Sequence, residues 1–149
     1  ASREDLERAL DAVHRAKTEL RRCRVPFAEN VPIGVLIETP AAALMAHELA
    51  QQAAFFHIST TNLTQYAHAA DRADPAVQEY FPAGSPAVHK LVHMAVDAAN
   101  EAHIPACVCC ESAARPALAE TYVRIGVRAL SMDMGSMLGV KEYLMGLTL

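Results

Sequence analysis

Side chains that can bind ions or take part in catalysis occur at four places in this sequence, each directly after a short apolar run. They are Glu38 and the polar groups at residues 60–62, 109–111 and 131–133. These groups are carboxylates, hydroxyls, an amide and thiols, which bind metal ions and anions or transfer protons. In a parallel α/β fold they would gather at the carboxyl ends of the strands and form one site.

Glu38 carries the strongest signal of the four. Its carboxylate ends the run "VLIE" and would be half-buried, and a buried carboxylate needs a cation, a metal ion or a proton. From the residues alone, metal or substrate binding and a purely structural role are equally open for Glu38. At the other three places, a polar residue where a strand meets solvent is the plainer interpretation.

The elements that would position these groups alternate between strands and helices. A leading amphipathic helix starts at Ser2, with a capping box to Asp5, and ends before Pro26. The predicted strands are "IGVLIETP", "FFHIST", "IPACVCC" and "ALSMD". The predicted helices are "AAALMAHELAQQA", "NLTQYAHAA" with Asn62 as its cap, "AVHKLVHMAVDAANEA", "PALAETYVRIG" and "GSMLGVKEYLMGL".

This order indicates the α/β class. Strict alternation of strands and helices favours a parallel sheet with right-handed crossovers. A leading helix plus four βα units is half of a (β/α)8 TIM barrel and leaves two open strand edges. The 149 residues suit a single domain spanning 1–149.

Composition and charge argue against several classes of function. The net charge is −4 and no basic cluster alternates with aromatic residues, so we expect no nucleic-acid partner. No apolar stretch reaches the roughly 18 residues of a membrane helix, so we expect no membrane insertion. The four cysteines, three of them crowded at 107, 109 and 110, favour a reducing cytoplasm. The chain begins with Ala1 rather than Met, as a piece of a longer protein would.

The same residues carry a resemblance to a known family. "IETP", "FFHISTTNLTQY", "ADR" and "VCCESAARP" match four motifs in order and with compatible spacing. These motifs belong to the carboxyl-terminal barrel domain of the phosphoenolpyruvate-utilising enzymes, and the sequence most resembles enzyme I of the bacterial sugar phosphotransferase system. The likeness runs from about residue 3 to the end of the chain. It implies the second half of a phosphoenolpyruvate-binding TIM barrel.

The resemblance also implies roles for particular residues. Glu38 and Asn62 stand at the positions that bind Mg²⁺, and Thr61 and Asn62 at those that contact phosphoenolpyruvate. Arg72 would pair with the anionic substrate, and Cys109 would protonate the enolate to give pyruvate. A trianionic substrate favours Mg²⁺ and guanidinium groups, and an enolate needs a positioned acid.

The chain departs from the family pattern around this predicted site. Asn62 stands where the family has a metal-binding aspartate, and Thr61 where it has an asparagine. Cys110 replaces a glycine, and Ala114-Arg115 replaces a glycine followed by an aspartate. Because the site loses a ligand carboxylate at Asn62, we expect weak binding of both Mg²⁺ and phosphoenolpyruvate.

Three functions are therefore open. The chain is part of a phosphoenolpyruvate–protein phosphotransferase that needs the missing barrel half and a histidine domain, a non-catalytic half-barrel that serves binding or oligomerisation, or a fragment of a pyruvate phosphate dikinase-like enzyme. Glu38, Arg72 and Cys109 favour the first. Asn62, Thr61 and Cys110 favour the second.

Further expectations concern surfaces and thiols. Four strands would leave an inner barrel face of Val35, Ile37 and Phe56 uncovered, which predicts self-association. Cys109, near Arg72 and a metal ion, would be the most readily alkylated thiol. Two other metal sites are less favoured. They are the helical pair His89 and His93, and a zinc cluster of the cysteines at 107, 109 and 110.

Overall fold

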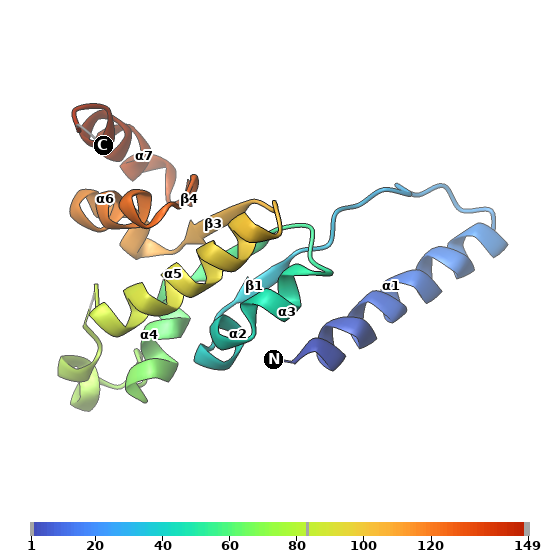
Figure 1. Ribbon diagram of the computed structural model, residues 1–149, viewed down its shortest axis with the longest axis horizontal. Helices are drawn as coiled ribbons and strands as arrows, with labels where there is room; N and C mark the ends of the chain where they lie inside the picture. Colours follow the sequence, from blue (N-terminus) through green and yellow to red (C-terminus); the bar gives the residue numbers. More distant parts are fainter. Residues whose placement is uncertain (1, 83, 148–149) are drawn as a thin grey trace.

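The computed structural model describes residues 2–82 and 84–147, and it shows one helix followed by alternating strands and helices (Figure 1). The strands are β1 (Val35–Ile37), β2 (Phe56–Ser59), β3 (Ala106–Cys109) and β4 (Ala129–Ser131). The helices are α1 (Arg3–Arg22), α2 (Pro40–Leu44), α3 (Ala46–Ala50), α4 (Thr60–His68), α5 (Pro86–Glu101), α6 (Pro116–Ile125) and α7 (Met134–Met145). Short 3-10 helices, η1 (Pro75–Tyr80) and η2 (Glu111–Ala114), precede α5 and α6.

The four strands form one parallel sheet in the order β1-β2-β3-β4. Each strand therefore pairs with the next one along the chain, as in a barrel wall that has been cut open. This confirms the predicted α/β class and matches one half of a (β/α)8 barrel. None of the helices within the described residues is long and apolar enough to cross a membrane.

The helices cover one face of this sheet. Ile37, Ile58 and Val108 lie in register across β1, β2 and β3, and each is 0% exposed. They pack in one core with Val92 and Val96 of α5, which runs across β2 and β3 (Figure 1). Strands with branched apolar side chains under a helix layer are typical of parallel sheets.

The other face of the sheet is uncovered, but the residues that lie on it differ from those that we predicted. Leu36 is 47% exposed and its neighbour in register, His57, is exposed as well. The prediction that Val35, Ile37 and Phe56 line the uncovered face is wrong, because all three pack toward the helices. Since β1 is apolar at every position, its sequence does not show which side faces the core.

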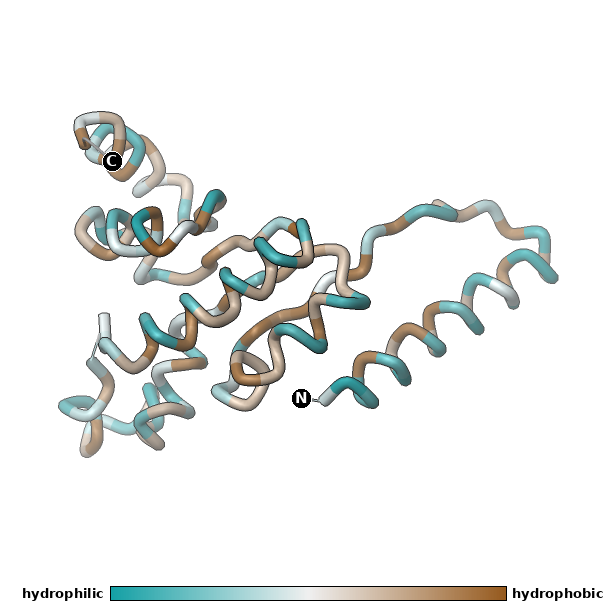
Figure 2. Tube along the Cα trace, in the orientation of Figure 1, coloured by the Kyte–Doolittle hydropathy of each residue, from teal (hydrophilic) through white to brown (hydrophobic). Residues whose placement is uncertain are grey.

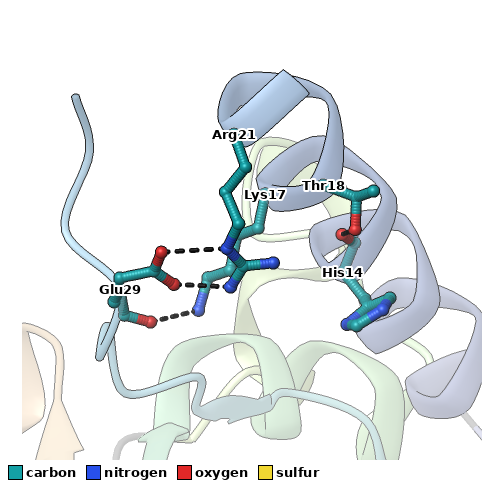
Figure 3. A network of polar contacts seen from close by, with 5 residues as sticks. All are labelled: His14, Lys17, Thr18, Arg21 and Glu29. Carbon is teal, nitrogen blue, oxygen red and sulfur yellow. Dashed lines mark hydrogen bonds and ion pairs between the residues drawn. The ribbon is translucent and has the colours of Figure 1, made fainter. Parts of the chain in front are cut away.

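Helix α1 extends away from the sheet (Figure 1) and contacts helix α3, and Leu6 near its start is 8% exposed. The predicted capping box is confirmed by a bond from the Asp5 backbone N–H to the Ser2 hydroxyl at 3.2 Å. Hydrophilic and hydrophobic residues alternate along α1 (Figure 2). At its far end Arg21 donates to both carboxylate oxygens of Glu29, at 2.9 and 2.6 Å (Figure 3). Lys17 donates to the Glu29 carbonyl oxygen, so the connector folds back along the helix.

Two helices differ from the prediction. The helix expected over 41–53 is divided at Met45, whose backbone (φ −97°, ψ 17°) separates α2 from α3. Both pieces pack against α5 through small buried residues such as Ala43 and Ala46. Helix α4 begins earlier than expected, and its N-cap is Ser59 rather than Asn62. The Asn62 side chain is therefore available for another contact.

Candidate functional site

A pocket of about 730 Å³ opens at the carboxyl ends of β2 and β3. Its wall comes from the start of α4, the segment around η1, and the turn from η2 into α6. Three of the predicted site residues, Thr61, Asn62 and Arg72, lie on this wall. Glu38 and Cys109 belong to neighbouring strand ends and lie beside the pocket, in contact with its lining residues.

A chain of hydrogen bonds joins three of these residues. The Asn62 amide nitrogen donates to a Glu38 carboxylate oxygen at 2.9 Å. The Asn62 amide oxygen accepts from the Arg72 guanidinium at 3.4 Å. Glu38 is half-buried, as predicted. The Glu38 carboxylate is thus partnered by the Asn62 amide N–H, and the Arg72 guanidinium bonds to the other end of that amide.

The pair Glu38 and Asn62 does not have the donor set of a Mg²⁺ site. Mg²⁺ is coordinated by oxygen atoms, whereas Asn62 directs an N–H group at the carboxylate and its oxygen toward Arg72. Nowhere in residues 2–82 and 84–147 do three His, Cys, Asp or Glu side chains form a group that could hold a metal ion. The less favoured metal site at His89 and His93 is not formed either, since His93 contacts Asp97 at 3.3 Å.

Cys107 and Cys109 lie on β3, and Cys109 approaches the Ile58 carbonyl oxygen at 3.5 Å. Burial, with a smaller contribution from neighbouring Cys110, raises the pKa of the Cys109 thiol to about 11. Burial also raises the pKa of Cys107. Both thiols therefore keep their protons at neutral pH. The raised pKa of Cys109 argues against the expectation that it is the most readily alkylated thiol, although a protonated thiol suits a proton donor.

Cys110 differs from both of these residues and lies on the pocket wall. Its backbone has φ 127° and ψ 173°, a conformation that is almost confined to glycine. Its sulfur lies 3.3 Å from the Ser59 hydroxyl oxygen. Burial acts to raise the pKa of this thiol, but hydrogen bonds from Ser59 and Thr61 outweigh it, so the pKa is lowered. Cysteine at this position thus brings both backbone strain and a thiol into the pocket.

Sequence reasoning missed several residues of this pocket. Tyr122 is 1% exposed and its hydroxyl donates to Ser112 at 3.1 Å, which ties α6 to η2. Arg115 was noted only as a departure from a motif, yet its side chain lines the pocket. Its position before Pro116, where a turn enters a helix, was the available signal. Asp133 has the structural role that the plainer interpretation predicted, because it caps α7 through Ser136 at 2.9 Å.

Comparison with known proteins gives the family that the sequence motifs indicated. The model of the family described as "PEP-utilising enzyme, PEP-binding domain" matches residues 1–148. A phosphoenolpyruvate-protein phosphotransferase of Borreliella burgdorferi is 36% identical over 141 residues, which is 95% of this chain and 25% of that protein. A multiphosphoryl transfer protein of Rhodobacter capsulatus is 40% identical over 78% of the chain, and a probable phosphoenolpyruvate synthase of Methanocaldococcus jannaschii is 31% identical over 83%.

These relatives are much longer than the region that they share with this chain. The chain spans 25% of the Borreliella protein, 14% of the Rhodobacter protein and 10% of the Methanocaldococcus protein. The similarity thus concerns one domain and not the remainder of those proteins. Since the family model covers almost the whole sequence, the chain belongs to the phosphoenolpyruvate-utilising enzymes, as a phosphoenolpyruvate-binding domain.

Proposed function

We propose that this chain is the phosphoenolpyruvate-binding part of a phosphoenolpyruvate–protein phosphotransferase. The observation that carries the proposal is the pocket at the carboxyl ends of β2 and β3, where Thr61, Asn62 and Arg72 come together. The catalytic cycle requires the other barrel half and a histidine domain, so the isolated chain is incomplete. A cytoplasmic location is part of the proposal and is supported by the four free thiols.

In this reaction the phosphoryl group leaves the enol oxygen of phosphoenolpyruvate for a histidine nitrogen, so a P–O bond breaks and a P–N bond forms. Arg72 pairs with the anionic substrate and orients it. The terminal carbon of the remaining enolate takes the thiol proton of Cys109, which gives pyruvate and a thiolate that regains its proton from water. The high pKa of Cys109 supports this role, because the thiol enters the step protonated.

Magnesium is the ion that the family resemblance implies. We propose that Glu38 and Asn62 bind it only weakly, since an amide replaces a carboxylate and points its N–H at Glu38. No step of the reaction above is therefore assigned to the ion. The proposed catalytic competence of this chain is correspondingly low.

A second candidate is a non-catalytic half-barrel that associates with itself or with a partner. The strained Cys110 and the uncovered sheet face around Leu36 favour it, because neither is needed to bind a small ligand. A synthase- or dikinase-like enzyme fragment remains a third candidate. The similarity to the Methanocaldococcus protein supports it, since the shared domain does not distinguish the reactions of the longer proteins.

Calorimetry with phosphoenolpyruvate in excess Mg²⁺ tests the proposal. We expect binding weaker than low micromolar, and a further loss of about tenfold or more in Arg72→Gln, because a charge-assisted contact is removed. Arg128→Gln is the matched control, since Arg128 directly precedes β4 at the opposite end of the sheet. If Arg72→Gln binds as tightly as the unchanged chain, the pocket is not the phosphoenolpyruvate site and the proposal fails.

A further inference from the structure

The contact between Glu38 and Asn62 satisfies both groups without a metal ion. The amide N–H meets the Glu38 carboxylate at 2.9 Å and the amide oxygen meets Arg72 at 3.4 Å. Two carboxylates at this separation would repel each other and would need a cation between them. An amide removes that need, because it offers a donor to the acid and an acceptor to the base.

The same pocket contains two guanidinium groups. Arg72 lies in the segment after α4, and Arg115 directly precedes α6. Both line the pocket, and within residues 2–82 and 84–147 neither forms an ion pair with a carboxylate. Glu111 is the one acidic side chain among the described lining residues. The lining side chains therefore carry one more positive than negative charge, and the Glu38 carboxylate beside the pocket is bonded to the Asn62 amide. An anionic ligand would neutralise the guanidinium groups.

Residues with hydroxyl groups line the same pocket. They are Ser59, Thr60, Thr61 and Ser112, of which Thr60 and Ser112 hydrogen-bond to each other and Ser59 contacts Cys110. Thr60 and Thr61 also form the first residues of α4, whose N-terminal backbone N–H groups have no partner within the helix. A helix N-terminus favours phosphate through these N–H groups and its dipole.

We propose that this pocket binds a phosphorylated carboxylic acid without a divalent cation, with Arg72 and Arg115 supplying the positive charge. This inference rests on the proposed function and adds to it that the site no longer depends on Mg²⁺. Asn62 bonds to Arg72 at the pocket wall, and Arg115 provides a second guanidinium from the turn before α6. Arginine suits this role, because its planar fork matches both phosphate and carboxylate oxygens.

The test is calorimetry with phosphoenolpyruvate in excess EDTA and in excess Mg²⁺. We expect dissociation constants that agree within about twofold under the two conditions. Arg115→Gln should weaken binding in EDTA by about tenfold or more, because one guanidinium is lost. Arg115→Lys should recover part of that loss by restoring charge without the fork. Arg128→Gln should leave binding unchanged, and circular dichroism checks that every variant is folded.

The outcomes separate this inference from the proposed function. Binding that requires Mg²⁺ and vanishes in EDTA would overturn the inference while leaving the phosphoenolpyruvate site in place. Equal binding by Arg115→Gln and the unchanged chain would overturn the role of Arg115. Absence of phosphoenolpyruvate binding under both conditions would overturn the proposed function itself.

Discussion

The thiols of β3 and its adjoining turn offer a sharp test of the site geometry. The pKa of Cys109 is raised from an ordinary 9.0 to about 11 by burial and by neighbouring Cys110. Below pH 9 its thiolate fraction is therefore about 100-fold smaller than that of an ordinary cysteine, and thiolate is the form that reacts. The pKa of Cys110 is lowered instead, and its side chain lines the pocket. We expect iodoacetamide to label Cys110 well before Cys109 at neutral pH.

Timed labelling followed by peptide mass mapping measures this order. Cys107, Cys109 and Cys110 share the tryptic peptide that follows Lys90 and ends at Arg124, so fragment ions must assign the label. Cys110→Ser is the matched control, because it removes the expected fast site and leaves the strand intact. Labelling of Cys109 that equals or precedes that of Cys110 would refute the reasoning.

The pH dependence of the labelling rates shows in which direction the pKa of each thiol is shifted. A raised pKa means that the Cys109 rate keeps increasing as the pH rises toward about 11. The Cys110 rate should level off at a lower pH, because its pKa is lowered. The raised pKa of Cys109 also links folding to pH, so its stabilising contribution is complete below about 9 and is lost as the pH rises through about 11. Phosphoenolpyruvate should slow the labelling of Cys110 and leave exposed Cys23 unaffected.

Three further changes have defined outcomes. Asn62→Asp should create Mg²⁺ binding that calorimetry detects, because it restores a ligand carboxylate beside Glu38, and Asn62→Ala should not. Equal Mg²⁺ affinity in both variants would count against Asn62 as a metal-ligand position. Cys110→Gly should stabilise the fold by about 1 kcal/mol in urea unfolding and Cys110→Ala should not, since only glycine relieves the backbone at φ 127°. Light scattering should show self-association that Leu36→Glu weakens, and a monodisperse 16.1 kDa species for the unchanged chain would contradict this.

The order of elements was predictable because each one has a local signal. The capping box of Ser2 and Asp5, the proline that begins α6 and Gly126 after it mark helix ends through their own backbone chemistry. Apolar runs between such signals give the strands. The parallel order then follows, because each strand is followed by a helix long enough to return the chain to the same end of the sheet.

The face that each strand side chain occupies was not predictable in the same way. "VLI" in β1 is apolar at all three positions, so no alternation distinguishes Leu36 from its neighbours. The register with β2 decides it, since Ile37 pairs with Ile58 under α5. Register depends on contacts distant in sequence, and a pattern within a single strand does not contain it.

The proximity of Glu38, Asn62 and Arg72 was predictable, but the bonds between them were not. Motif positions identified Glu38, Asn62 and Arg72, and the structure connects all three. The contacts between them depend on where the N-cap of α4 falls. With Ser59 as the cap, Asn62 is freed from that role and turns toward Glu38. A shift of one turn at a helix start therefore decides whether an amide caps a helix or neutralises an acid.

The departures from the family pattern at Asn62 and Arg115 change the charge of the pocket in the same direction. By the resemblance, Asn62 stands in place of an aspartate and removes one negative charge from the site, and Arg115 stands in place of a second aspartate, removing its charge and adding a positive one. Together they make the pocket about three charges more positive, which is comparable to the two charges that a bound Mg²⁺ would contribute. A site that merely decayed would have no reason to gain a cation on its wall. Retention of anion binding after loss of the metal would require such a gain, so phosphoenolpyruvate binding by Arg115→Gln distinguishes a site that adapted from one that was abandoned.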